Sequence, residues 1–295
     1  MTKKHMPWAD YNAPYTEDTK NCNTLTQNRK IDTVTVMLQL KYRTLSLLAL
    51  AVAVPGVALS EAVSPALLSP DESAVRATTV EAGDFDQLLL KRTTEARLAA
   101  GVQGLSPHKQ LSAVAQAHAQ DMAQRGYAAD VTPEGLTLLD AVRQSDRQTL
   151  YSAFGSNIAI AEAGADPDAV FSAIMSDASN SENLLRDGFC HVGIGSYEHG
   201  GRLYVVQLLA RVEGRLEQPL PVDAGDADSL RAEFSARGMT PISWSVSDDA
   251  GQTLLRGSGE RIRDPRGNEI EGYLNLDVAM GQDVYTFRGP YVRVK

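Results

Sequence analysis

His118 is the side chain in this sequence that is best placed to do chemistry, because an imidazole can act as a base or bind a metal ion. It lies in the segment LSAVAQAHAQDMAQRGY, residues 111–127, where apolar residues recur at the three- and four-residue spacing of a helix. This spacing places His118 on the apolar face, and Gly126 is positioned to end the helix. We therefore interpret His118 as a hydrogen-bonded core residue rather than as a ligand or a base.

The other residues capable of catalysis lack a supporting pattern. Ser152, Ser156 and Ser172 have no nucleophile-elbow context, and we expect His108 to be exposed in a loop. The sequence contains no phosphate-binding glycine loop, no CxxC and no HExxH. A Ser-His-Asp triad can still be assembled from residues that are distant in sequence, so a hydrolase stays open as an alternative.

Length and charge restrict the classes of function. The 295 residues suit about two domains of ordinary composition. The formal net charge of -9 argues against a nucleic-acid-binding protein, which usually presents a basic face. It also gives no reason to expect attraction to an anionic membrane.

The N-terminal part has the layout of a secretory signal. Residues 1–36 are polar and aperiodic, and we interpret them as a non-native extension before the true start at Met37. Residues 37–62 place basic Lys41 and Arg43 before an apolar run that ends in small residues, which predicts a signal peptide cleaved between Ala58 and Ala62. The alternative is a retained membrane anchor.

Cleavage at this place would have two consequences. The segment 63–84, rich in Ser, Pro, Ala and acidic residues, would become an N-terminal linker. Cys22 would be lost, leaving Cys190 as the single cysteine in an apolar run, which predicts a buried and unreactive thiol.

The central part predicts helices packed on a small antiparallel sheet. Helical patterns follow Asp84 and cover 111–126, 136–147, 168–175 and 180–185, and β-forming residues at 192–197 and 203–212 flank Gly200-Gly201. This combination is typical of an α+β domain.

Residues 88–212 resemble a bacterial CAP domain, also called the SCP or cysteine-rich secretory protein, antigen 5 and PR-1 domain. The matching positions are Thr94 (where the family has Asn), Arg97, Gly101, Leu105, the A-x-x-H-A-x-D-M pattern at 115–122, Ser156-Asn157-Ile158-Ala159, Val192 to Gly195, and Val206-Gln207. The resemblance implies a three-layer α-β-α sandwich over residues 85–213.

The resemblance also implies a cleft in which two His and acidic partners can hold a divalent metal. At those positions this sequence has Asp130, Ser156 and Asn180, the last placed three residues before Asn183. Such a set cannot offer two imidazoles to zinc, so we expect no metal and no cofactor. We assign the three residues as cleft positions that are either a structural remnant of the family's site, which we favour, or a site that binds a small ligand. Arg97, His118, Asn157 and Asn183 are assigned structural roles.

The C-terminal part predicts a small β-rich module. Pro219 and Pro221 mark a linker at 214–225, and the module would span 226–295. We expect a short helix at 226–237 and then strands separated by turns at 248–251 and 264–268. The alternative is an extension of the first domain that shares its core.

Together these features predict a secreted or periplasmic, non-catalytic CAP-like protein. It would bind a small ligand, including a lipid, or an envelope or extracellular protein, with no nucleic acid and no stable membrane span after signal cleavage. The rivals are a hydrolase-like enzyme with a rearranged polar cleft and an envelope structural or adaptor protein.

Overall fold

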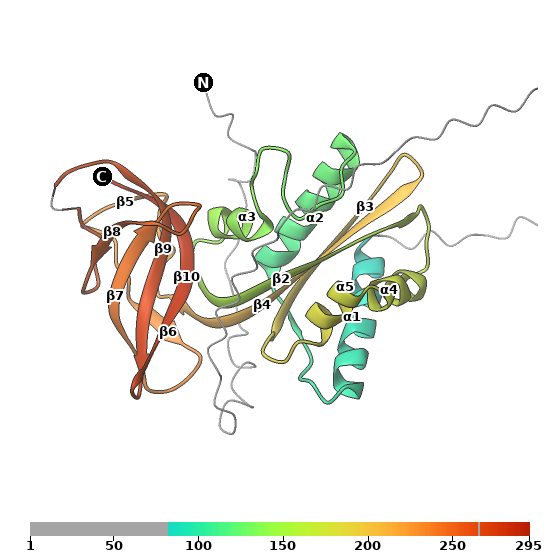
Figure 1. Ribbon diagram of the computed structural model, residues 1–295, viewed down its shortest axis with the longest axis horizontal. Coiled ribbons are helices and arrows are strands. Elements are labelled where there is room, and N and C mark those ends of the chain that lie inside the picture. The colour runs from blue at the N-terminus through green and yellow to red at the C-terminus, as the bar shows by residue number, and fades with distance from the viewer. Residues whose placement is uncertain (1–81, 265) are drawn as a thin grey trace, which may run out of the picture. The chain divides into compact units, whose positions relative to one another are not determined.

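The computed structural model describes residues 82–264 and 266–295, all of which belong to one compact unit (Figure 1). The predicted extension 1–36, the signal peptide 37–62 and nearly all of the linker 63–84 lie outside the described residues. No helix in the described part is both long enough and apolar enough to cross a membrane.

Five helices and ten strands follow one another along the described residues. The helices are α1 (Ala82–Ala99), α2 (Lys109–Arg125), α3 (Leu138–Ser145), α4 (Pro167–Ser176) and α5 (Ala178–Leu185). The strands are β1 (Ser106–Pro107), β2 (Thr149–Glu162), β3 (His191–His199), β4 (Arg202–Leu216), β5 (Asp223–Ala224), β6 (Ala232–Phe234), β7 (Met239–Ser247), β8 (Thr253–Gly257), β9 (Ile270–Met280) and β10 (Asp283–Val294).

These strands form one hydrogen-bonded sheet in the order β1-β3-β4-β2-β10-β9-β7-β8, with β5 beside β10 and β6 beside β4. The pairs are antiparallel except for β1 with β3 and β5 with β10. The central strands join the C-terminal strands where Arg288 of β10 pairs with Tyr151 of β2.

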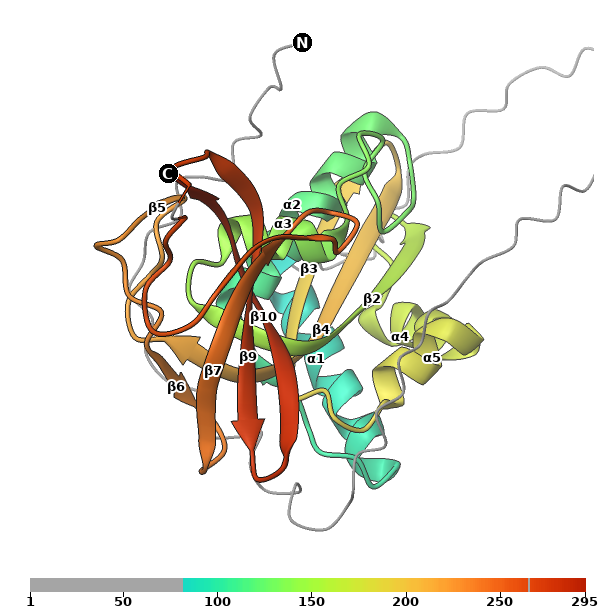
Figure 2. The ribbon, with the colours of Figure 1, turned by 60° about the vertical axis from the view of Figure 1, so that its left-hand side comes forward.

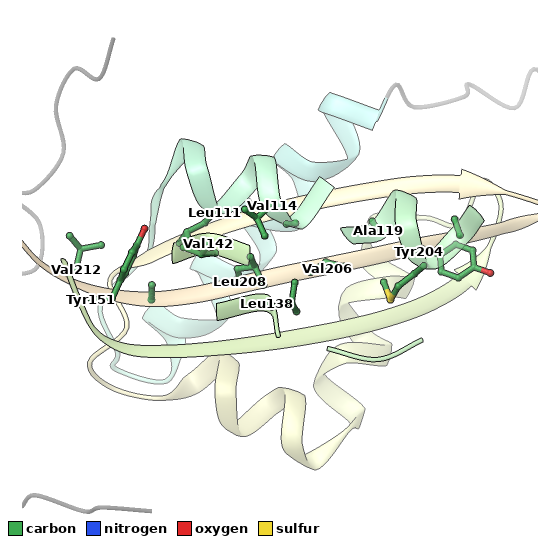
Figure 3. Packing of buried hydrophobic residues seen from close by; sticks show 14 residues of the cluster. Leu111, Val114, Ala119, Leu138, Val142, Tyr151, Tyr204, Val206, Leu208 and Val212 are labelled. Carbon is green, nitrogen blue, oxygen red and sulfur yellow. The ribbon is translucent and has the colours of Figure 1, made fainter. Parts of the chain in front are cut away.

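Helices cover both faces of the central strands, and the alternation of side chains along β4 shows this directly. Tyr204, Val206 and Leu208 pack in one cluster with the buried residues of α2 and α3 (Figure 3). Leu203, Val205 and Leu209, which point to the opposite face, pack in another cluster with α1, α4 and α5. The predicted α+β fold with three α-β-α layers is therefore confirmed.

Two glycines allow α2 to lie directly on β3. A Cβ atom on Gly193 would come within 2.1 Å of the backbone carbonyl carbon of Leu111, and one on Gly195 within 2.1 Å of the backbone nitrogen of Gln116. The Gln116 side chain then bonds both backbone groups of Ser196, donating at 2.9 Å and accepting at 3.1 Å. Any larger side chain at these glycines would push the helix away from the sheet.

The C-terminal strands bury their own apolar cluster, which includes Trp244, Leu274 and Phe287. Segments between β4 and β7 cover this cluster and contribute Leu220 and Leu230. The helix predicted at 226–237 is wrong, because Ala232–Phe234 forms β6 and pairs with Gly214 to Leu216 of β4. Pairing with an available strand edge and burial of Leu230 outweigh the local helical pattern.

Two arginines near the end of α3 bind carbonyl oxygens of the C-terminal strands. Arg143 donates to Gly289 at 2.7 Å and Leu274 at 2.6 Å, and Arg147 donates to Tyr291 at 2.7 Å. Burial lowers the pKa of each guanidinium to about 10. These bonds link α3 to β9 and β10. The domain boundaries proposed at 213 and 226 stay a prediction.

Candidate functional site

The structure places the three predicted cleft residues on different elements. Asp130 is exposed in the loop after α2, Ser156 is half-buried in β2, and Asn180 is half-buried in the first turn of α5. Ser156 lies two residues from both Phe154 and Ile158, which pack on the α2 side of the sheet. Residues two apart in a strand share a face, so the Ser156 side chain points to the same side. Asn180 approaches from the opposite layer, and the assignment of a shared cleft stays a prediction.

Two asparagines of α5 bind the outer edge of β2, along which α5 lies (Figures 1 and 2). The side-chain amide of Asn183 donates to the carbonyl oxygen of Ser156 at 3.1 Å, and that of Asn180 donates to Ile158 at 3.4 Å. Because these carbonyls belong to residues two apart, both point to the same edge of β2. The amides therefore give hydrogen-bond partners to two backbone groups of β2.

A buried polar chain lies behind this contact. Asn157 is 1% exposed and donates to the carbonyl oxygen of Asn180 at 3.1 Å and to the side chain of Gln207 at 3.4 Å. Gln207 in turn donates to the Thr93 hydroxyl of α1 at 3.1 Å. The Asn157 Oδ1 atom is buried without a hydrogen-bond partner. Side chains thus connect α1, β4 and β2, and the backbone carbonyl of Asn180 adds α5.

Arg97 fixes the segment that follows α5. Its guanidinium is fully buried and donates to the carbonyl oxygens of Leu184, Phe189, Gln103 and Arg186 at 2.6, 2.9, 2.8 and 3.1 Å respectively. Burial lowers the pKa of Arg97. A planar group with several fixed donors suits this task, which a lysine could not perform.

His118 holds the loop that carries Asp130. The ring is 3% exposed, and its Nε2 atom lies 2.7 Å from the carbonyl oxygen of Ala129. A carbonyl only accepts, so Nε2 carries the proton. Burial lowers the pKa of His118, while the bond to Ala129 opposes that shift. The ring also meets the edge of Tyr127, with ring centroids 5.8 Å apart.

The α2-facing side of β2 presents a half-covered apolar strip, defined here as Phe154, Ser156, Ile158 and Ile160. Helix α2 packs on β3 and β4, so β2 is less covered on this side of the sheet. Phe154 and Ile158 are half-buried, whereas Ile160 is 39% exposed. The strip therefore offers apolar surface on both sides of the Ser156 hydroxyl.

A second polar cluster, formed by His108 and His191, lies at the start of α2. His108, expected to be exposed, is 3% exposed and caps α2, with Nδ1 accepting from the Leu111 backbone N–H at 3.4 Å. Its ring lies 5.6 Å from that of His191, and burial lowers the pKa of His108 to about 4. Its place just before an apolar helical pattern was the available signal, since side chains that accept hydrogen bonds favour that position.

The prediction of Cys190 as a lone thiol is wrong. Cys190 is 3% exposed, as expected for an apolar run, but it is disulfide-bonded, and no described cysteine is free. The other cysteine of the sequence, Cys22, lies outside the described residues. Among the described residues, no group of three or more His, Cys, Asp or Glu side chains is arranged to hold a metal ion.

One family model matches the central part of the chain. Residues 90–209 match the family model of CAP, the cysteine-rich secretory protein family. No curated protein matches the chain.

Several solved structures are similar to about half of the chain. An outer surface protein from Borrelia burgdorferi is 14% identical, with a TM-score of 0.40 over 45% of this chain and 97% of that protein. An extracellular SCP-domain protein from Bacillus anthracis is 24% identical, with a TM-score of 0.39 over 48% of this chain and 45% of that protein. A cysteine-rich secretory protein from Staphylococcus aureus is 15% identical, with a TM-score of 0.34 over 44% and 40%. On the family match and the layered fold, residues 90–209 form a CAP domain of the cysteine-rich secretory protein family.

Proposed function

We propose that this protein is exported and acts as a non-catalytic CAP-domain protein that binds an apolar ligand or partner along β2. The observation that carries the proposal is the chemistry of the three cleft positions. Asp130, Ser156 and Asn180 provide one carboxylate, one hydroxyl and one amide. Neither the hydroxyl nor the amide is a base at neutral pH, so Asp130 is the single ionisable group of the set.

The use of Asn180 supports the same conclusion. Its side-chain amide bonds Ile158, and its backbone carbonyl accepts from Asn157. A side chain engaged in holding α5 on β2 contributes to the fold rather than to a reaction. A histidine at this position would offer a ring nitrogen, whereas the Asn180 amide hydrogen-bonds β2 and so holds α5 on that strand.

The apolar strip on β2 supports a binding role. An apolar ligand gains free energy from contact with half-exposed side chains, on the order of 25 cal/mol for each Å² removed from water. Ile160 and Phe154 supply such surface next to the Ser156 hydroxyl. The formal net charge of -9 would disfavour acidic head groups, so neutral or cationic amphiphiles are favoured.

The test is binding of a neutral fluorescent lipid probe to the full chain and to Ile160→Asp. The matched control is Leu98→Asp, since Leu98 is 60% exposed on α1 and away from β2. The proposal expects saturable binding by the parent and the control and at least tenfold weaker binding by Ile160→Asp. Equal binding by all three proteins, or turnover of ester substrates by the parent that is lost in Ser156→Ala, would contradict it.

A further inference from the structure

The C-terminal strands β7 to β10 have a polar face that points away from their apolar core. Along β9, Leu274 and Leu276 are buried in the core cluster, whereas Asn275 and Asp277 alternate with them and point to the opposite side. The register across the strands therefore decides which polar side chains lie next to one another on this face.

One row of this face carries an arginine at each end. Arg256 of β8 pairs with Ser245 of β7, Ser245 pairs with Asn275 of β9, and Asn275 pairs with Arg288 of β10. Directly paired residues of antiparallel strands share a face. Both arginines are exposed, while Ser245 between them is 8% exposed. The row thus has small polar side chains in its middle and an arginine at each end.

A third guanidinium reaches the same row from α3. Arg143 is 7% exposed, donates from Nη2 to the Asn275 side-chain oxygen at 3.1 Å, and lies 4.5 Å from the centroid of the Tyr273 ring. Its Nε atom binds the carbonyl of Gly289, the residue after Arg288. Arg143 and Arg288 therefore both adjoin Asn275.

Part of the donor capacity of these two arginines is unused within the described residues. The bonds of Arg143 use Nε and Nη2, and Arg288 uses Nη1 to bind the backbone carbonyl of Ser152 at 3.2 Å. In the described part of the chain, no carboxylate forms an ion pair with Arg143, Arg256 or Arg288. The pKa of Arg143 is lowered first by burial and then by the charge of Arg288.

Two acids bear on these arginines. Asp140 of α3 raises the pKa of Arg143 through its charge, but the two form no ion pair within the described residues. Asp277 lies one row further along β9 and accepts from the hydroxyls of Ser243 at 2.6 Å and Thr286 at 2.7 Å. Arg143 and Arg288 both adjoin Asn275, and the charge of Arg288 lowers the pKa of Arg143, in a protein whose net charge is -9. Such a cluster of like charges favours a bound anion, which removes their repulsion.

We propose that Arg143 and Arg288 bind a phosphate group above Asn275, with Arg256 attracting the rest of the ligand. Phosphate carries a charge of about -1.5 to -2 near neutral pH and three acceptor oxygens, which match two guanidinium groups. A carboxylate carries one charge and would leave part of the positive charge uncompensated. This site lies on the C-terminal strands and shares no residue with the apolar strip of β2.

The test is thermal unfolding of the full chain in inorganic phosphate and, as separate arms, in glycerol 3-phosphate and in acetate at equal ionic strength. A ligand that binds the folded state raises the melting temperature with saturation. The variants are Arg288→Gln and Arg256→Gln, and Arg202→Gln is the matched control because Arg202 is an exposed arginine at the start of β4. Arg143 is left intact because it holds α3 on the sheet.

The proposal expects both phosphates, but not acetate, to raise the melting temperature of the parent and of Arg202→Gln. Apparent affinity should fall at least tenfold in Arg288→Gln and by a smaller factor in Arg256→Gln. A stronger response to glycerol 3-phosphate than to inorganic phosphate would assign the site to phosphate esters, and the reverse would assign it to the free ion. No response of the parent, an equal response to acetate, or an unchanged response of Arg288→Gln would overturn the proposal.

Discussion

The Nε2 atom of His118 lies 2.7 Å from the carbonyl oxygen of Ala129, so a side chain from the centre of α2 fixes the loop that follows the helix. Asp130, the next residue, is exposed, although it stands where the resemblance implies a ligand histidine. The loop is therefore held by a buried imidazole on its inner side, while its outer side faces water.

His118→Ala should lower the free energy of unfolding by about 1–3 kcal/mol through the unpaired Ala129 carbonyl, with a further loss from the cavity. Asp130→Ala is the matched comparison and should change it by no more than about 0.5 kcal/mol, since Asp130 is exposed. Urea titration of both variants at one pH measures the difference. A stable His118 variant beside an unstable Asp130 variant would reverse the two roles.

Asp86 should make stability depend on pH. Burial raises the pKa of this carboxyl from 3.8 to about 6, against the bond that Ser196 donates at 2.7 Å. A raised pKa means that the folded state binds the proton more tightly than the unfolded state does. The contribution of Asp86 to the free energy of unfolding therefore grows as the pH falls through about 6 towards 3.8. Between pH 7.5 and 5, the parent should gain stability relative to Asp86→Asn.

Urea titrations of the parent and Asp86→Asn at several pH values isolate this residue, because the other titrating groups are common to both proteins. An asparagine can still accept from Ser196, so the variant keeps that bond. Parallel stability curves over this interval would show that the carboxyl has an ordinary pKa in the folded protein.

The fold could be read from the sequence where periodicity was strong. The α2 pattern around His118 predicts which of its side chains are buried, and the nearly continuous apolar run of β4 is typical of a strand that is buried on both faces. The helix predicted after Gly225 is wrong, since the β4 edge that Ala232–Phe234 joins is not visible in local sequence. Residues such as Arg143, whose carbonyl partners are more than a hundred positions away, carry no local signal either.

The candidate site was predictable as a set of positions but not as a set of contacts. The resemblance indicated Ser156 and Asn180 by alignment, yet only the structure shows that Asn180 bonds the edge of β2. The expectation of an exposed His108 rests on its place beside Pro107 and is wrong. His108 caps the first turn of α2, and its ring lies against that of His191.

Stability should not depend on zinc. Asp130, Ser156 and Asn180 provide no imidazole, so a strong chelator should leave the melting temperature unchanged, since a metal bound to the folded state would raise it. Ser156→Glu with Asn180→His and Asp130→His would restore the ligand types that the resemblance implies. A clear drop with chelator in the parent, reversed by added zinc, would require a metal site built from other residues.

Export should begin from Met37. The basic residues Lys41 and Arg43 before an apolar run predict that a chain expressed from Met37 in a Gram-negative host reaches the periplasm. Mass spectrometry of the periplasmic fraction should find an N-terminus between Ala58 and Ala62. A chain expressed from Met37 lacks Cys22 and carries Cys190 as its single cysteine, so thiol labelling in denaturant should find one thiol per chain. A membrane-bound product with an intact apolar segment would contradict cleavage.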